Sequence, residues 1–486
     1  MRKSYWMAGL LLIVAVIAVP AAYFWPRSAA GAGDPWQAMP DRPVHTEHTD
    51  IVTGPFETPQ EVTAACLECH PDASAEMMQT THWTWESPPL NVPWRDEPVT
   101  IGKKNTINNF CIGIQGNWKK CTSCHTGYGW ADAGYDFSDP LNVDCLACHA
   151  DTAVYAKGDY GNPAEGVDLV AAAQSVRAPT RDNCGSCHFD GGGGNNVKHG
   201  DLDESLYFPS ENLDVHMGEH DFLCTDCHRT EEHVVKGRLL ADNYQIDPAE
   251  QVACTDCHEP DLHEDERINM HVESVACQTC HIPATALKNP TKVDWDWSTA
   301  GQDLPEDHLT YLKIKGSFMY EEDYQPSYSW WNGNAAYRYI LGDTINPDEV
   351  TDMNPPAGDI EDANAKIFPF KMHTAKQPYD SEHNYLLQPV TAGEGGFWSE
   401  FDWDKSLALG EEVTGLPYSG SYGFAETRMH WPTTHMVQPA EKALQCEDCH
   451  GEQGRLDWEA LGYPGDPVDW GGRFSSQQLQ TSAAGR

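Results

Sequence analysis

The hydrophobic and polar positions divide this chain into one apolar run near its start and a long polar body. Residues 7–25 are apolar almost throughout, and the basic stretch Met1-Arg2-Lys3 precedes them. A basic start followed by an apolar run and small residues is typical of an export signal. Because the run approaches the length that spans a bilayer, a cleaved signal peptide and a retained membrane anchor both remain open. We therefore expect residues 1–34 to carry the chain out of the cytoplasm.

The polar body predicts short elements and long connections. After residue 34, no segment is apolar enough to span a membrane. Segment 282–445 is rich in aromatic side chains and contains proline and glycine throughout. The tail 475–486 is polar and low in complexity, so we expect it to be disordered. The pattern favours a mainly α fold with extensive irregular structure.

Cysteine and histidine recur together in eight C-x-x-C-H segments, which use sixteen of the seventeen cysteines. In this motif both thiols add to the vinyl groups of a haem, and the adjacent histidine becomes an axial ligand of the iron. A C-x-x-C pair alone would also fit a redox dithiol or half of a zinc site, but neither explains a histidine after the second cysteine eight times. We therefore predict eight covalently bound haem c groups. The attachment residues are Cys66, Cys69, Cys121, Cys124, Cys145, Cys148, Cys184, Cys187, Cys224, Cys227, Cys254, Cys257, Cys277, Cys280, Cys446 and Cys449. The proximal histidines are His70, His125, His149, His188, His228, His258, His281 and His450.

The spacing of the motifs predicts how the chain is organised. The first seven begin between Cys66 and Cys277, with gaps that hold at most a helix and a turn. This gives a haem-dense region 35–281 with seven haems, an aromatic region 282–445 that wraps them and supplies distal ligands, and a segment 446–474 with the eighth haem. The predicted architecture is a multihaem cytochrome c fold organised around a packed array of eight haems.

Fourteen further histidines are available as distal ligands of the iron atoms. Iron with two histidine ligands stores and passes electrons but offers substrate no place to bind, so the function depends on whether one haem differs. An isolated histidine is more often a hydrogen-bonding residue than a ligand, but the odds reverse close to haem motifs. The preferred distal ligands are His82, His199, His216, His233, His263, His271 and His435, followed by His48 and His373.

The formal net charge of −43 restricts the partners of the chain. It argues against nucleic acid and anionic membrane surfaces, whereas a basic redox partner remains open. We expect a periplasmic or otherwise extracytoplasmic body that touches a membrane only through residues 7–25, if these are retained as an anchor in the inner membrane. An extracytoplasmic or membrane redox donor would serve it, and oligomerisation remains open.

The second haem motif lies in a window of unusual charge. Residues 98–131 contain no aspartate or glutamate. They carry Lys103, Lys104, Lys119 and Lys120. In so acidic a protein, a small anionic substrate could approach a haem here, although a solvated lysine face is the plainer alternative. Cys111, the one cysteine outside the motifs, also lies here and is either an inert buried thiol or a reactive one favoured by nearby cations.

A glycine-rich segment, residues 191–200, carries a second candidate. Its four consecutive glycines allow the backbone to approach a flat cofactor closely. If Val197 to Gly200 is extended, Lys198 and His199 point to opposite sides and serve two different haems. A neutral lysine amine can ligate iron when burial and metal binding lower its pKa.

Several long stretches carry a family resemblance, among them "INNFCIGIQGNWKKCTSCHTGYGW", "CHFDGGGGNNVKHGDLD" and "WDWSTAG". From about Val62 to Pro467 the sequence resembles the octahaem tetrathionate reductase family of multihaem c-type cytochromes. The resemblance implies that the second haem is the active one and that a lysine, here Lys198, is its distal ligand.

The same resemblance implies two further residues of the pocket and one departure. Cys111 and Asn269 match the thiol and the amide that the family places there. Asn195 stands where the family is expected to have aspartate. An amide does not take up or release a proton as a carboxylate does, so this departure bears on proton delivery and on substrate choice.

The leading hypothesis is an oxidoreductase that passes electrons along seven haems to a lysine-ligated active-site haem. That site would reduce a small sulfur or nitrogen oxyanion or related compound, with tetrathionate, nitrite and hydroxylamine as candidates. Cys111 favours sulfur chemistry, because a thiolate can attack an S–S bond. One alternative is a non-catalytic electron conduit. Another, a hydroxylamine-oxidising enzyme, is weaker because no long helical region follows the last motif. An ammonia-forming reductase with a C-x-x-C-K haem is disfavoured, since all eight motifs end in histidine.

Overall fold

The computed structural model describes residues 35–39, 41–42, 44–110, 113–237, 251–469 and 473. These residues fall into two compact units. Of the described residues, the smaller unit contains 35–39 and 253–272, and the larger unit contains the rest. The predicted signal or anchor 1–34, Cys111 and the tail 475–486 lie outside the described residues.

The smaller unit carries the sixth haem motif. It consists of η1 (Pro35–Ala38), the 3-10 turn η9 (Cys254–Asp256) and α9 (Glu266–His271). Asp265 caps α9, because its side chain accepts a hydrogen bond from the backbone N–H of Arg267.

Most helices of the larger unit coincide with haem motifs and are short. Two cysteines three residues apart lie on one face of a single helical turn, so one turn is enough to present both thiols. The helices that contain motif cysteines are α2 (Pro59–Leu67), α4 (Trp118–Cys121), α5 (Leu146–His149), α7 (Arg181–His188), α8 (Cys224–Cys227), α10 (Cys277–His281) and α13 (Cys446–Cys449). The remaining α-helices are α3 (Ala73–Met77), α6 (Leu169–Gln174), α11 (Phe397–Glu400) and α12 (Trp403–Thr414).

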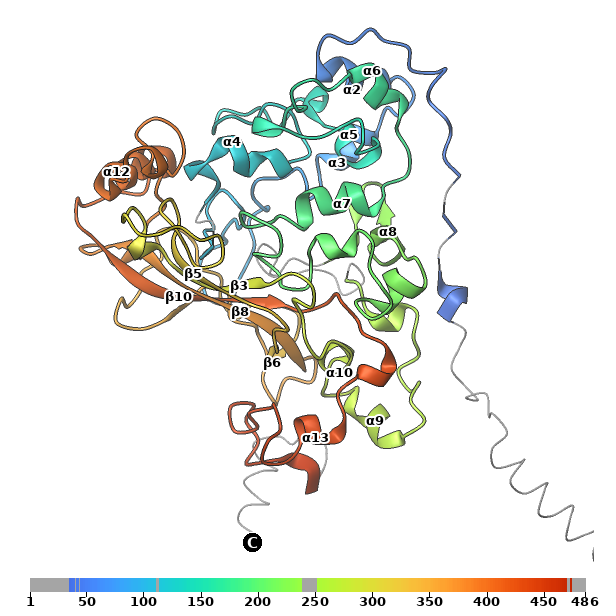
Figure 1. Ribbon diagram of the computed structural model, residues 1–486, viewed down its shortest axis with the longest axis vertical. Coiled ribbons are helices and arrows are strands. Elements are labelled where there is room, and N and C mark those ends of the chain that lie inside the picture. The colour runs from blue at the N-terminus through green and yellow to red at the C-terminus, as the bar shows by residue number, and fades with distance from the viewer. Residues whose placement is uncertain are drawn as a thin grey trace, which may run out of the picture. The chain divides into compact units, whose positions relative to one another are not determined.

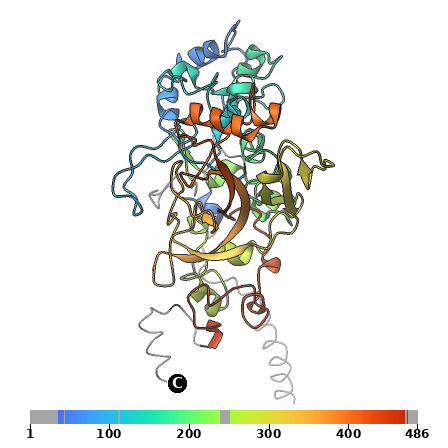
Figure 2. The same ribbon diagram turned by 90° about the vertical axis from the view of Figure 1, so that its left-hand side faces the viewer.

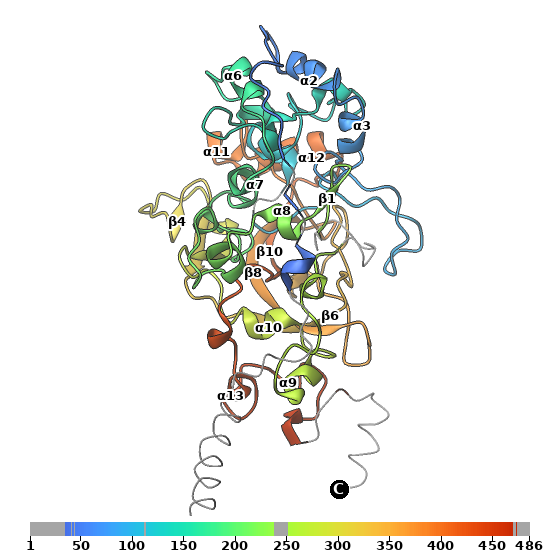
Figure 3. The same ribbon diagram turned by 90° about the vertical axis from the view of Figure 1, so that its right-hand side faces the viewer.

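The described helices include none that is long and apolar enough to cross a membrane. The longest of them, α12, has 12 residues. Asp402 caps its start through the backbone N–H of Lys405, and Gly415 ends it in the left-handed conformation. Helix α12 lies against α11 and the 3-10 turn η2 (Ile114–Gly116), and Figures 2 and 3 show it in orange above the long strands of the sheet.

An eight-stranded sheet forms the centre of the larger unit. Its path runs β4-β5-β3-β8-β10-β7, with β6 and β9 also paired to β8; β3 and β8 are parallel, as are β10 and β7. The strands are β3 (Thr291–Asp296), β4 (Tyr311–Leu312), β5 (Gly316–Glu321), β6 (Ser327–Trp331), β7 (Thr351–Asp352), β8 (Lys366–Asp380), β9 (Tyr385–Leu386) and β10 (Tyr422–Pro432). A separate two-stranded ribbon pairs β1 (Thr230–Glu231) with β2 (Val234–Val235). Figure 1 shows α4, α5 and α7 on one side of the long strands β8 and β10.

This sheet does not confirm the prediction of a mainly α chain. All its strands lie within segment 282–445, which has no haem motif and was predicted to wrap the haems and supply distal ligands. Strand β8 has 15 residues and β10 has 11. Their aromatic and β-branched residues pair across the strands, which stabilises a sheet where haem contacts are not available.

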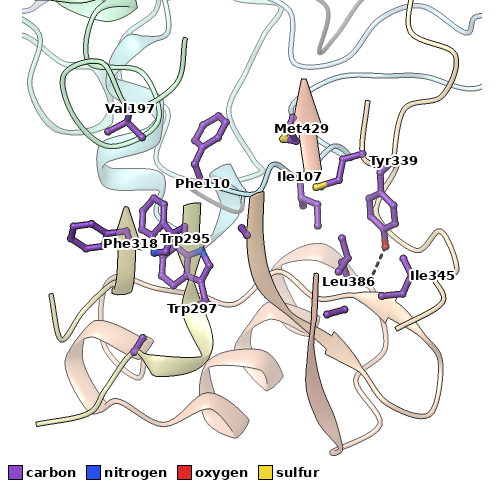
Figure 4. Close-up of a cluster of buried hydrophobic side chains, with 14 of the residues drawn as sticks. Ile107, Phe110, Val197, Trp295, Trp297, Phe318, Tyr339, Ile345, Leu386 and Met429 are labelled. Carbon is purple, nitrogen blue, oxygen red and sulfur yellow. Dashed lines mark hydrogen bonds between the residues drawn. The ribbon is translucent and has the colours of Figure 1, made fainter. Parts of the chain in front are cut away.

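The largest hydrophobic cluster joins both candidate segments to this sheet. Ile107 and Phe110 come from the window 98–131, and Val197 comes from the glycine-rich segment. They pack with Trp295 on β3 and Met429 on β10 (Figure 4). Full burial of each large apolar side chain stabilises the fold by about 1.5–3 kcal/mol. The core therefore holds the two predicted reaction-site segments against one sheet.

Candidate haem sites and reaction site

The thiols of different haem motifs touch one another and show which motifs are neighbours. The sulfur atoms of Cys66 and Cys145, of Cys124 and Cys187, and of Cys184 and Cys224 lie close together. The first motif therefore adjoins the third, and the fourth adjoins both the second and the fifth. The seventh and eighth are also close, because Cys449 contributes, after burial, to raising the pKa of Cys280 to about 12. Such contacts suit electron transfer between haems.

Outer hydrogen bonds orient several motif histidines as expected for iron ligands. The Nδ1 atom of His149 donates to the backbone oxygen of Arg177 at 3.0 Å, and that of His228 to the oxygen of Lys236 at 2.8 Å. Metal-ligating histidines usually give their second ring nitrogen to such an acceptor, which fixes the tautomer and the ring orientation. These histidines therefore fit the predicted role of proximal ligand.

Two motif histidines face a second histidine at the spacing of a shared iron. The ring centres of His188 and His82 are 6.2 Å apart, and those of His228 and His435 are 6.1 Å apart. Two imidazoles on one metal put their ring centres about 6 Å apart, because each metal–nitrogen bond is about 2 Å and each ring centre lies about 1.1 Å further on. His82 and His435 were both predicted as distal ligands.

Three other predicted distal histidines of the larger unit lie in defined surroundings. His233 donates from Nδ1 to Glu76 at 2.7 Å, just after the first motif, and it is an electrostatic neighbour of His149. His48 stacks on His45, with ring centres 5.1 Å apart. His216 lies on the π-helical turn η7 (Val215–Glu219) beside Phe222.

His373 lies on β8 with none of its surface exposed. Its Nδ1 pairs with the side-chain oxygen of Asn109 at 2.9 Å, while Nε2 is buried without a hydrogen-bond partner. Asn109 also donates to the backbone oxygen of His373 at 2.7 Å. Sequence reasoning missed this pair, which fixes the chain immediately before Phe110 and Cys111.

In the smaller unit, His263 and His271 share a compact body with the sixth motif. His271 pairs through Nδ1 with the backbone oxygen of Arg267 at 2.6 Å. Asn269 accepts from the backbone N–H of His263 at 2.9 Å and donates to its backbone oxygen. The amide of Asn269 thus organises the loop that carries His263.

The proximal histidine of the second motif lies in an aromatic enclosure. His125 is 8% exposed, and the ring centres of Trp130, Trp83 and Tyr135 lie 4.7, 5.0 and 5.6 Å from its own. Its Nε2 pairs with the backbone oxygen of Trp83 at 2.8 Å, while Nδ1 is buried without a hydrogen-bond partner. Burial above all lowers the pKa of His125 to about 3, which keeps the imidazole neutral as a ligand must be.

The window 98–131 contains no acidic residue, but acidic residues from other parts of the chain lie beside it. This corrects the expectation of a positive patch, which rested on composition. Lys104 pairs with Glu86 at 2.6 Å, while Lys119 and Lys120 both pair with Asp159, at 3.1 and 2.8 Å. These pairs are exposed and match the plainer reading of a solvated lysine face. Acids distant in sequence neutralise what a local count suggested was a positive patch.

A positive field nevertheless acts on the second motif from two other lysines. Lys103 and Lys157 both contribute to lowering the pKa of His125 and of Cys124. Lys157 is largely buried and pairs with Asp144 at 2.6 Å, whereas Lys103 is exposed. Part of the predicted attraction for an anion therefore remains at this haem.

The glycine-rich segment forms turns and bends, so the condition that Val197 to Gly200 is extended is not met. The ammonium of Lys198 lies 4.9 Å from the centre of the Trp431 ring, and the ring of His199 lies 5.3 Å from it. Both side chains therefore meet the same aromatic residue. At Gly192 the backbone adopts a φ of +81°, and an added Cβ would lie 2.6 Å from Phe110, so glycine is required there.

Two residues of the sheet contact this segment, and the sequence analysis did not identify either of them. Lys371 is fully buried and donates from Nζ to the backbone oxygens of Val197 at 2.7 Å and Lys198 at 3.2 Å. Trp431 lies opposite Lys371 in the antiparallel register of β8 and β10. No periodicity marks a buried lysine in a strand, so only the tertiary structure identifies it.

Asn195, predicted in the catalytic set, has its side chain engaged within the loop. Its Oδ1 accepts from the backbone N–H of Glu204 at 2.9 Å. The following residue, Asn196, is fully buried in the left-handed conformation and donates to the backbone oxygen of Asn289 at 2.7 Å. These amides shape the loop that carries Lys198.

Comparison with known proteins connects these sites to a family. The family model described as "Cytochrome c bacterial" matches residues 292–453, which include the sheet and the eighth motif. An uncharacterized protein from Archaeoglobus fulgidus is 26% identical over 238 residues, covering 38% of this chain and 79% of that protein. The crystal structure of octaheme cytochrome c from Shewanella oneidensis matches with a TM-score of 0.82 and 47% identity, covering 89% of this chain and 100% of that chain. The match confirms the multihaem fold and the covalently bound haem c. This chain therefore belongs to the octahaem c-type cytochromes, which are multihaem redox proteins.

Proposed function

We propose that the protein is an extracytoplasmic reductase whose reaction site is the second haem motif, Cys121 to His125, with Lys198 as the distal ligand. Covalently bound haem c supplies one-electron transfer at each motif. At the reaction site, Lys198 would yield its position or supply positive charge while a small sulfur or nitrogen compound is reduced. Tetrathionate, nitrite and hydroxylamine are the candidate substrates.

The observation that carries this proposal is the support that the sheet gives to Lys198. Lys371 fixes the backbone oxygen of Lys198, and Trp431 lies 4.9 Å from its ammonium. The electrostatic neighbours of this ammonium include His188 and His199. His188 belongs to the fourth motif, which touches the second through Cys187 and Cys124. These contacts hold the backbone of Lys198 and put its ammonium close to the fourth motif, which adjoins the second, and this supports Lys198 as the proposed ligand.

We propose that the remaining haems relay electrons with two histidine ligands each. The ring spacings support His82 as the distal ligand at the fourth motif and His435 at the fifth. His263 or His271 would serve the sixth, which shares their unit. His48, His199, His216, His233 and His373 are candidates for the others. This array would deliver electrons from an extracytoplasmic or membrane donor to the second motif.

Binding of external ligands distinguishes the proposed reductase from a non-catalytic electron conduit. The close contacts between motifs are compatible with both. Oxidised and reduced protein would be titrated with nitrite and hydroxylamine while electron paramagnetic resonance and optical spectra are recorded. The proposal expects one of the haem centres to bind these ligands, and Lys198→Met to change the spectrum of that same centre. Lys104→Met, an exposed lysine of the same window that is paired with Glu86, is the matched control. Unchanged spectra for both ligands would favour the conduit.

A further inference from the structure

Asp466 is hydrogen-bonded to the proximal histidine of the eighth motif. Its Oδ1 accepts from His450 Nδ1 at 2.5 Å, and its Oδ2 accepts from the backbone N–H of Gly451 at 2.7 Å. The backbone N–H of Val468 also donates to Oδ1, at 3.0 Å. The side chains of Asp466 and His450 are only 23% and 19% exposed. Two backbone groups therefore hold this carboxylate beside the imidazole.

Other motif histidines have a different acceptor. His149 and His228 donate to the neutral backbone oxygens of Arg177 and Lys236. A carboxylate carries a full negative charge, so its hydrogen bond makes the ligating imidazole more basic than a carbonyl does. A more basic axial ligand favours ferric over ferrous iron and lowers the reduction potential. The eighth motif therefore differs from the third and fifth in a feature that tunes haem.

The surroundings of His450 add to this difference. The ring of Trp458 stacks on the imidazole with centres 5.2 Å apart and planes 16° from parallel. A cavity of about 780 Å³ opens beside His450, and its walls include Glu447, Asp448 and Arg455. Arg455 is the cation of this lining and donates to the backbone oxygen of Pro283 at 2.8 Å. The net charge close to the motif is thus negative, and Asp466 is the acid in direct contact with the ligand.

We propose that Asp466 is a positioning residue that fixes the imidazole of His450 and holds the eighth haem at a lower reduction potential than a neutral acceptor would give. This inference depends on covalent haem at the motif, and it holds whichever substrate the protein reduces.

The test is a redox titration of the holoprotein and of Asp466→Asn, followed by electron paramagnetic resonance. Asparagine keeps an oxygen acceptor for His450 and removes the charge. The equilibrium constant for reduction of one haem centre is expected to rise about tenfold, which raises its reduction potential by 59 mV for one electron. The reduction potentials of the other centres should not change. Asp448→Asn is the matched control. Both carboxylates lie close to the motif, because Asp448 and Asp466 each add to burial in raising the pKa of Cys449. Asp448, however, accepts a hydrogen bond from the backbone N–H of Gln445.

The possible outcomes distinguish tuning of the reduction potential by Asp466 from an effect of any nearby negative charge and from a structural role in haem attachment. A smaller shift in Asp448→Asn, together with the original potential in Asp466→Glu, would support the proposal. No shifted centre in Asp466→Asn, or an equal shift in Asp448→Asn, would overturn it. Loss of one haem from Asp466→Asn, measured as pyridine haemochrome, would also overturn it in favour of a role in haem attachment.

Discussion

Lys371 and Trp431 face each other across β8 and β10, and both reach the loop that carries Lys198. Opposite residues of an antiparallel pair present their side chains on the same face of the sheet. Two residues further along, His373 pairs with Met429, and both contact Asn109. One face of one strand pair thus supports the two segments in which the reaction site was predicted.

Replacing Lys371 by methionine is expected to disturb Lys198 without loss of haem. Methionine fills similar space but removes the donor of a buried carbonyl, that of Val197, at a cost of about 1–3 kcal/mol, and of the partly buried carbonyl of Lys198. We expect the spectrum assigned to the lysine-ligated haem to change and turnover to fall at least tenfold. Lys292→Met is the control, because Lys292 is also buried, but its ammonium lies 3.4 Å from the centre of the Trp295 ring. Equal effects of both variants would contradict a specific role for Lys371.

Removing the carboxylate of Asp201 is expected to release His435. Its Oδ2 accepts from the backbone N–H groups of Thr434 and His435 and pairs with His435 Nδ1 at 3.3 Å. In Asp201→Ala these groups lose their acceptor, so a high-spin haem signal should appear and thermal stability should fall. Asp214→Ala is matched, because buried Asp214 accepts from the next two backbone N–H groups along this segment. Because Asp214 also caps the turn η7 that carries His216, the comparison is made at the centre that becomes high-spin in Asp201→Ala. Asp214→Ala should lower stability but leave that centre unchanged; a high-spin signal from the same centre would refute the assignment of His435.

The buried pair of Lys157 and Asp144 is expected to be important for stability. Their side chains are 10% and 0% exposed, and Tyr155 also donates to Asp144, at 2.7 Å. Lys157→Met would leave a buried carboxylate without its cation and lower the free energy of unfolding by about 3–5 kcal/mol. Guanidinium denaturation would measure this against Lys119→Met, which removes an exposed ion pair and should change stability little. Similar losses in the two variants would show that burial of the pair is unimportant.

Cys111 is expected to be needed for sulfur chemistry alone. A thiolate can attack the S–S bond of tetrathionate, whereas nitrite offers no such bond. Cys111→Ala should therefore lose tetrathionate turnover and keep nitrite turnover, both measured with the same electron donor. Equal loss with both substrates, or no loss with either, would remove the thiol mechanism.

The haem sites could be predicted from the sequence because covalent haem attachment requires a fixed local motif. The sheet could not be predicted in this way. Each C-x-x-C-H motif is local, so its residues could be assigned from spacing, and each motif cysteine pair folds as one turn. The sheet depends on pairing between residues far apart, such as Trp295 with Ala375 and Ala375 with Thr427. No local pattern in segment 282–445 revealed these pairs.

The candidate site shows the same contrast between what local sequence predicts and what long-range contacts determine. The family resemblance implied Lys198, and the glycine-rich segment suggested His199, but local composition misjudged the charge around the window 98–131. Lys119 and Lys120 meet Asp159 only through folding, and the turns after Gly192 bring Lys198 and His199 to one tryptophan. Long-range contacts set the electrostatics, so a count over neighbouring residues could not supply them.

The most direct test of the proposed function is reductant-driven turnover by the purified holoprotein with tetrathionate, nitrite and hydroxylamine. The account predicts reduction of at least one of these compounds, and a loss of that activity in Lys198→Met with the haem content unchanged. Failure of all three substrates, or full activity in Lys198→Met, would contradict a lysine-ligated reaction site at the second haem.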